Sequence, residues 1–148
     1  MSFLNSFDIS ASGLTAQRQR LDIASENISN MNTTRTESGG PYRRKMVVLE
    51  AKNSAPSFRS EFQSRLSRRV SEKGGVQVTN IVEDKRDLQP VYDPEHPDAN
   101  ENGYVMMPNV DLVKEVTDSM SATRSYEANI TAFNAIKLMA QKALEIGK

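Results

Sequence analysis

The chain has 148 residues, and its 19 Lys/Arg balance its 19 Asp/Glu, so that the formal net charge at pH 7 is zero. Apolar residues make up 37% and aromatic residues 6%, which is little core material for a compact globular domain. The absence of cysteine excludes disulfides and thiolate metal sites. No stretch approaches the roughly 18 apolar residues of a membrane span, so we expect no membrane insertion. The opening MSFLNSFDIS also lacks the features of a cleaved secretory signal.

The charge is unevenly distributed along the chain. Residues 35–73 contain ten Lys/Arg and four Asp/Glu, whereas residues 83–118 contain three Lys/Arg and ten Asp/Glu. Such opposed patches can match each other within one fold or steer subunits into register. Ordinary solvated charge is an equally good interpretation, and a nucleic-acid partner is not expected because the chain is not net basic. The candidates for electrostatic register are Arg43, Arg44, Arg68, Arg69, Asp84 and Asp87.

The first predicted element is a helix that begins near Ser2 or Asn5 and runs to about Asn30. Apolar side chains recur every seven residues in it, at Phe7, Leu14, Leu21 and Ile28. A seven-residue repeat places a narrow apolar seam on one face of a helix, which is typical of helix-on-helix packing. A narrow seam buries little area, so we expect this helix to need a partner.

The middle of the chain predicts loops and short strands. A polar loop is expected over residues 33–40, and Met46 to Leu49 fit a strand because they are β-branched or apolar. Residues 76–82 predict a second strand with a phase slip, since Val76 and Val78 alternate and Ile81 and Val82 resume on the other phase.

The later part of the middle is less regular. Phe58, Phe62, Leu66 and Val70 lie four residues apart, which fits a helix but also permits an irregular strand. Residues 89–103 hold three prolines and predict a loop, and Tyr104 to Met107 predict a last short strand.

The last element is a long helix, predicted over residues 109–146 with Asn109 as its N-cap after Pro108. Its apolar pattern changes phase part of the way along. Val113, Val116 and Met120 follow one line, whereas Tyr126, Ile130, Phe133 and Leu144 follow another. The predicted fold is therefore mainly α, with the two long terminal helices paired as a coiled coil. The expected parts are residues 1–34 and 109–148 for the helices and 35–108 for a small β-containing module.

One segment carries side chains that suit a metal ion. Residues 93–98 contain Asp93, Glu95, His96 and Asp98, and Glu101 follows. Their spacing fits neither an EF-hand loop nor H-E-x-x-H, and two prolines hold the segment extended, so a connecting loop is the favoured interpretation. The chain has no cysteine, no G-x-S-x-G and a single histidine, so neither enzyme activity nor a cofactor is expected, and a hydrolase is a remote alternative.

Both ends of the chain resemble the terminal signatures of the bacterial flagellar rod and hook proteins. The N-terminal resemblance covers residues 12–30, where a helix ends in an Asn-rich turn, and the C-terminal one covers residues 108–115 and 124–129. Residues 40–45 and 92–98 resemble features of the proximal rod members. The matching signature positions are Gly13, Leu14, Ala16, Gln17, Asn27, Asn30, Asn109, Val110, Arg124 and Tyr126.

The resemblance implies a structural subunit of the hollow axial rod that transmits torque across the periplasm. It also implies other rod subunits and basal-body proteins as partners, and export through the flagellar type III apparatus without cleavage of a signal. The apolar seams are then expected to pack subunits together. Another proximal rod subunit of the same family, or a periplasmic metal- or glycan-binding adaptor, is the alternative.

Overall fold

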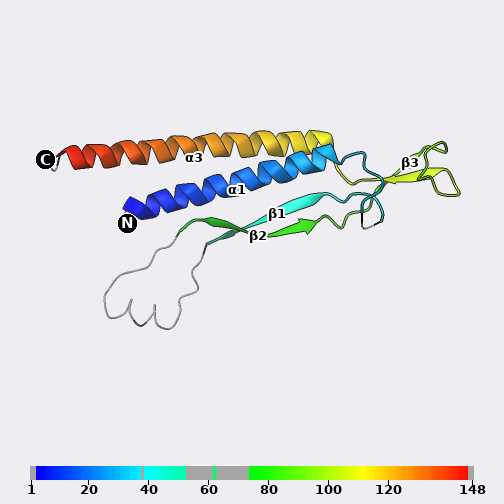
Figure 1. The fold of residues 1–148 in the computed structure, drawn as a ribbon, viewed down its shortest axis with the longest axis horizontal. Coiled ribbons are helices and arrows are strands. Elements are labelled where there is room, and N and C mark those ends of the chain that lie inside the picture. The colour runs from blue at the N-terminus through cyan, green and yellow to red at the C-terminus, as the bar shows by residue number, and fades with distance from the viewer. Residues whose placement is uncertain (1–2, 38, 53–61, 63–73, 147–148) are drawn as a thin grey trace.

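The computed structural model describes residues 3–37, 39–52, 62 and 74–146. Two long helices lie side by side along the long axis, and the strands form a small β region, so the fold is mainly helical as predicted (Figure 1). In chain order the elements are α1 (Phe3–Ser29), β1 (Lys45–Ala51), β2 (Val76–Glu83), β3 (Gln89–Tyr92), β4 (Tyr104–Met107) and α3 (Leu112–Ile146).

The two helices run antiparallel, with both chain ends at the same end of the molecule (Figure 1). The ring of Phe7 meets that of Phe133 edge-on at 4.8 Å between centroids. At the other end of the pair, the amide of Asn27 bonds Glu115. The helices approach closely because small side chains lie between them and their neighbours, and Ala16, Ala24 and Ala122 are among the few fully buried apolar residues. The side-by-side packing is observed, and the coiled-coil pairing stays a prediction.

The predicted start of the second helix is wrong by three residues. The carboxylate of Asp111 accepts the backbone N–H groups of Val113 and Lys114, at 2.9 and 3.3 Å, so Asp111 caps a helix that begins at Leu112. Asn109 does not cap the helix, because its side chain is buried among the strands.

The strands β1 and β2 form an antiparallel ribbon that lies along α1. Lys45 pairs with Glu83 and Ala51 with Val76, and the register shifts between Val48 and Leu49. The shift leaves one extra residue on β2, which is a β-bulge. This bulge accounts for the phase slip that the sequence predicted. At one end of the ribbon, the hydroxyl of Ser12 on α1 accepts the N–H of Val76.

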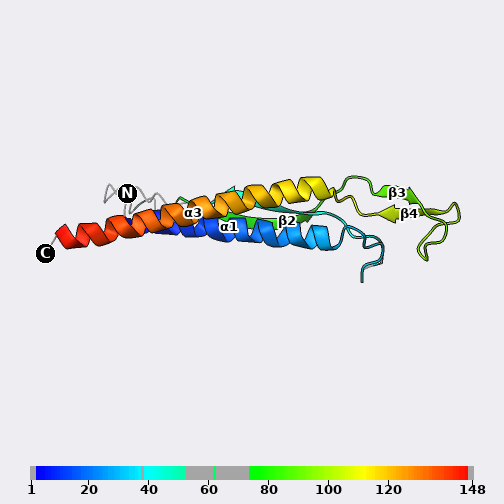
Figure 2. The same ribbon diagram turned by 90° about the horizontal axis from the view of Figure 1, so that it is seen from above.

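The predicted loop over residues 89–103 is partly wrong, because β3 occupies its first four residues. Gln89 pairs with Met107 and Tyr92 with Tyr104 in a second antiparallel ribbon. Pro90 is tolerated there because β3 is an edge strand. At the tip, Gly103 has φ of +77°, and a Cβ on it would lie 2.9 Å from the Tyr92 ring. The ribbon projects beyond the helices, away from the chain ends (Figures 1 and 2).

Of the four apolar residues whose spacing permitted a helix or a strand, only Phe62 belongs to the described part of the chain. It is helical and exposed. The remaining three, Phe58, Leu66 and Val70, lie outside the described residues.

Candidate functional site

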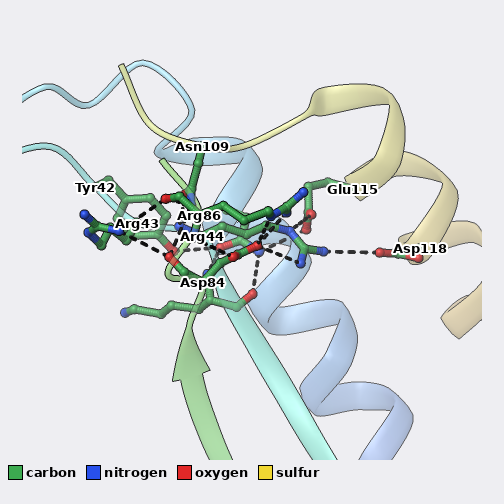
Figure 3. Close-up of polar contacts among 10 residues, drawn as sticks. Tyr42, Arg43, Arg44, Asp84, Arg86, Asn109, Glu115 and Asp118 are labelled. Carbon is green, nitrogen blue, oxygen red and sulfur yellow. Dashed lines mark hydrogen bonds and ion pairs between the residues drawn. The ribbon is translucent and has the colours of Figure 1, made fainter. Parts of the chain in front are cut away.

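Polar side chains from five parts of the chain meet where the helix pair joins the strands (Figure 3). They come from the last turns of α1, the segment entering β1, the end of β2, the segment before α3 and the first turn of α3. We call this set the junction cluster: Asn27, Tyr42, Arg44, Asp84, Asn109 and Glu115. All six are buried, with relative exposures between 1 and 8%.

Arg44 and Glu115 form the charged centre of the cluster. The Nε of Arg44 donates to Oε1 of Glu115 at 2.6 Å, and the Glu115 side chain is 2% exposed. Other nitrogens of the same guanidinium lie 3.9 Å from Asp84 and 3.4 Å from Asp118. A buried charge is tolerated only when it is paired and hydrogen-bonded, so these groups need one another. The pairing therefore ties β1 and β2 to α3.

Asn27 uses all the hydrogen-bonding capacity of its amide group. Its nitrogen donates to the carbonyl of Lys45 and to Glu115, both at 2.9 Å. Its oxygen accepts the N–H of Lys45 and the hydroxyl of Tyr42, also at 2.9 Å. The amide thus pairs with both backbone groups of Lys45, as a neighbouring strand would. This fixes the start of β1 against α1.

Asn109 likewise bonds backbone groups, on the other side of the segment that leads into β1. Its oxygen accepts the N–H of Arg44 at 2.9 Å, and its nitrogen donates to the carbonyls of Asp84 and Arg86 at 3.2 Å. A residue read in the sequence as a helix cap therefore joins two strands. The local pattern Pro-Asn before a helix could not show this, because the partners lie 23 to 65 residues away.

Two groups in the cluster have shifted pKa values. Burial raises the pKa of Tyr42 to about 12, and the nearby negative charges of Glu26, Glu115 and Glu83 add to the shift. The pKa of Asp84 falls to about 2, chiefly because the guanidinium of Arg86 and then its backbone N–H donate to the carboxylate. Tyr42 thus stays neutral and Asp84 stays charged at physiological pH.

The chemistry of the cluster is structural. No buried side-chain nitrogen or oxygen in the described part of the chain lacks a hydrogen-bond partner. What the arrangement can do is hold the ribbon β1–β2 and the helix pair in one fixed orientation.

The predicted seam of α1 lies on the covered side of the helix but does not mark its most buried residues. Phe7, Leu14, Leu21 and Ile28 are all half-buried. Full burial falls instead on Ser10, Ala16, Ala24 and Asn27. The covered face is wider than a coiled-coil seam, because α3 lies on one side of α1 and the ribbon β1–β2 on another. Three of these four positions carry small side chains, which form no apolar repeat in the sequence, so the repeat could not reveal them.

The two predicted lines on α3 face opposite ways. Tyr126 and Phe133 are half-buried toward α1, whereas Val113, Val116 and Met120 are 76, 42 and 54% exposed. Val113 and the buried Ala122 are nine residues apart, which at 3.6 residues per turn puts them about 180° apart. The phase change in the sequence thus separates a face against α1 from an outward face. Ile130 and Leu144 are exposed, at 38 and 75%.

The family-signature residues divide between packing and hydrogen bonding. Gly13 lies where a Cβ would come within 3.1 Å of the Asn129 side chain. Gln17 accepts a hydrogen bond from Arg20, and the Asn30 amide donates to the carbonyl of Glu26. The others are Leu14, Ala16, Asn27, Asn109, Val110, Arg124 and Tyr126, of which only Arg124 is exposed.

The residues predicted for electrostatic register have different surroundings. Arg44 and Asp84 are buried in the junction cluster, so their charges act within the chain. The guanidinium of Arg43 donates to the carbonyls of Asp84 and Arg86, at 3.4 Å. Asp87 is exposed. Arg68 and Arg69 lie outside the described residues.

The segment with possible metal ligands forms turns at the tip of the ribbon β3–β4. The ring Nδ1 of His96 accepts the N–H of Asp98 at 3.1 Å, and the Asp98 carboxylate accepts the hydroxyl of Thr34. Across residues 3–37, 39–52, 62 and 74–146, no three His, Asp or Glu side chains gather as metal ligands. Within those same ranges, neither long helix is apolar enough to span a membrane.

Two flagellar families match the chain. Residues 7–35 match "Flagella basal body rod protein", and residues 101–146 match "Flagellar basal body rod FlgEFG protein C-terminal". Three relatives, each named flagellar basal-body rod protein FlgC, match essentially end to end. The identity is 52% to that of Bacillus subtilis strain 168 and 41% to that of Escherichia coli O6:H1, over the whole of both chains. It is 42% to that of Borreliella burgdorferi, over 99% of this chain and 98% of the relative.

These relatives confirm the resemblance to rod proteins and do not favour an adaptor. Their identity of 41 to 52% is measured over alignments that span the whole chain, including its middle as well as the two terminal signatures. The chain therefore belongs to the FlgC-like flagellar basal-body rod proteins, as a structural subunit that assembles with other rod components of the basal body.

Proposed function

We propose that this subunit forms a wall segment of the proximal rod, a hollow shaft that crosses the periplasm and transmits torque. In this proposal the helix pair α1–α3 is a coiled-coil unit that stands in the wall, and the ribbons project from it. The elongated shape, with both chain ends at one end of the helix pair, supports such a role (Figure 1). The role is mechanical, because the directional bonds of the junction cluster hold the ribbon and the helix pair in one orientation.

The observation that carries the proposal is the outward face of α3. Val113 and Met120 near the start of the helix are 76 and 54% exposed, and Leu138 near its end is 61% exposed on the same side. Exposed apolar side chains spread along one helix mark an interaction surface when they are this numerous. Neighbouring subunits that cover this face by head-to-tail contacts would form a helical line, because such contacts do not close.

The junction cluster supports the mechanical part of the proposal. Directional hydrogen bonds between Asn27, Arg44 and Glu115 resist rotation of the ribbon against the helices, because any rotation leaves a buried polar group unpaired. A subunit that transmits torque needs this kind of stiffness. Tyr42 and Asn109 add bonds from two further segments.

The remaining parts of the proposal concern export and register. A chain without cysteine suits passage through the narrow type III export channel as an unfolded polypeptide, without cleavage of a signal. Charge would chiefly set the register between subunits, with Asp87, Arg43 and the pair Arg68 and Arg69 as candidates.

A charge placed on the outward face tests the assembly role. Leu138→Asp leaves the isolated chain folded, because the side chain is 61% exposed, but puts a charge where a neighbour must bury it. We expect loss of rod assembly and of motility, while circular dichroism and export of the variant stay normal. Ala132→Asp, at an exposed position about 120° around the same helix from Leu138, is the matched control. Motile cells that carry only Leu138→Asp would overturn the proposal.

A further inference from the structure

The ribbon β3–β4 has one apolar face that is about half exposed, with Thr34 and Pro41 lining a groove beside Tyr104 and Met106. Because Tyr92 pairs with Tyr104 and Pro90 with Met106, these four side chains share a face. Tyr92, Tyr104 and Met106 are 65, 44 and 47% exposed, although the two tyrosine rings touch edge-on at 5.3 Å. Exposed Tyr and Met on a projecting element are typical of protein interfaces.

Acidic side chains lie beside this face at the tip of the ribbon, while Arg35 lines the groove next to Tyr104 and Met106. The tip carries Asp93, Glu95, Asp98 and Glu101, and residues 87–113 contain neither lysine nor arginine. Asp98 bonds Thr34, whereas Asp93, Glu95 and Glu101 are exposed and enter no ion pair within the described ranges. The matching partner surface must therefore have an apolar centre and a basic rim.

The first half of the outward face of α3 has this composition. Val113, Val116 and Met120 form its apolar centre. Lys114 and Arg124 flank them, are exposed, and make no ion pair with any residue that the structure describes. Val113, Met120 and Arg124 follow one line, since steps of seven and four residues return to nearly the same side of a helix.

These two surfaces cannot meet within one chain. The ribbon leaves the start of α3 and extends away from it, beyond the end of the helix pair (Figures 1 and 2). A second copy placed ahead along the same axis can bring its α3 to the ribbon. The two surfaces differ, so the contact is heterologous and repeats from copy to copy without closing.

We propose that the β3–β4 ribbon of one copy docks on the first half of the outward face of α3 in a second copy. Pro90, Tyr92, Tyr104 and Met106 cover Val113, Val116 and Met120, and Asp93 and Glu95 face Lys114 and Arg124. The proposal rests on the assembly role and names the contact that continues the line of subunits.

Cross-linking in assembled rods tests the contact directly, because the chain has no cysteine of its own. Cells express two single-cysteine copies, Met106→Cys and Val116→Cys, and a thiol-specific cross-linker is added to isolated basal bodies. We expect a homodimer band only when both variants are present. Met106→Cys with Ala135→Cys, an exposed position in the second half of α3, is the control. Rods that assemble but give no Met106–Val116 band, or that link Met106 to a different protein, overturn the proposal.

A charge exchange gives an independent test. Lys114→Glu with Arg124→Glu removes the basic rim, and we expect its incorporation in competition with wild type to fall about tenfold. Adding Asp93→Lys with Glu95→Lys to the same chain restores opposite charges and should recover most of the loss. No loss, or no recovery when thermal unfolding shows that each variant folds, overturns the contact. The assembly role itself fails only if Leu138→Asp is also tolerated.

Discussion

The two ends of the helix pair are built in opposite ways. At the junction end, five chain segments converge on polar side chains, and Glu115 and Asn27 are only 2 and 1% exposed. At the end that holds the chain termini, Phe7 and Phe133 are half-buried, and α3 continues to a Leu144 that is 75% exposed. The junction end is held by a buried polar network, whereas the other end is held by apolar contacts such as the Phe7–Phe133 pair.

The difference shows how one subunit can be both rigid and adhesive. Hydrogen bonds and ion pairs are directional and fail when their geometry changes, so they suit a joint that must keep one angle. Apolar contacts are non-directional and scale with area, so they suit a surface that a neighbour completes. Four substitutions test whether the two ends differ in this way.

The largest effect is expected from Glu115→Ala. The change leaves Arg44 buried without its main partner, and breaking a buried ion pair in this way costs about 3–5 kcal/mol. Urea unfolding measures the loss in the free energy of unfolding. Glu127→Ala, at an exposed position of the same helix, should stay within about 0.5 kcal/mol of wild type. Equal stability of the two variants would show that the junction is not the stabilised end.

Phe133→Ala should cost less, about 2 kcal/mol, because its side chain is half-buried and loses its edge-on contact with Phe7. The effect should also be local. Amide exchange is expected to speed up over residues 5–14 and 128–140 and to stay slow around Asn27 and Glu115. Uniform loss of protection along both helices would mean that the two ends unfold as one unit.

The pH dependence of stability provides the next test. The pKa of Asp84 is about 2 in the folded chain, below its ordinary value of 3.8. The unfolded chain therefore takes up the proton first as pH falls, so the stabilisation is complete above about pH 4 and is lost toward pH 2. Asp84→Asn should melt at a lower temperature than wild type at pH 7. Its melting temperature should also lack the fall toward pH 2 that the titration of Asp84 causes. Asp22→Asn, at an exposed position of α1, is the control that should keep it.

The smallest effect concerns Gly13. Alanine favours a helix by about 1 kcal/mol over glycine, but its Cβ would lie 3.1 Å from the Asn129 amide. We expect the two effects nearly to cancel in Gly13→Ala. In an Asn129→Ala background the crowding is absent, so the full gain of about 1 kcal/mol should appear. A double-mutant cycle in thermal unfolding measures the coupling, and additive effects would exclude close packing at this position.

The periodic parts of the fold were predictable from the sequence. Helical spacing of apolar residues placed the long helices, short apolar runs placed β1, β2 and β4, and the phase slip before Ile81 appears as the bulge in the ribbon. These patterns are local, so neighbouring residues suffice to reveal them. β3 was missed because the three prolines of residues 89–103 led to the prediction of a loop. A proline is nevertheless compatible with an edge strand.

The junction cluster was not predictable in the same way. Arg44 and Asp84 stood out only as members of opposed charge patches, and Glu115 only as a favourable charge near a helix start. Burial converts these surface-like residues into a network, and burial depends on which distant segments meet. The family signature did contain Asn27 and Asn109, but it gave no indication that their amides replace strand neighbours.

The long sequence separations within the junction cluster also affect when the chain can fold. Asn27 and Glu115 are 88 residues apart, so their bond closes a loop of more than half the chain. Contacts between residues so far apart in the sequence form slowly, because the chain loses conformational entropy in closing the loop before the contact stabilises it. In the proposed export, neither helix can reach its polar partner until most of the chain has left the channel, whichever terminus leads. The proposal therefore expects the chain to stay unfolded during passage and to form the junction cluster only afterwards.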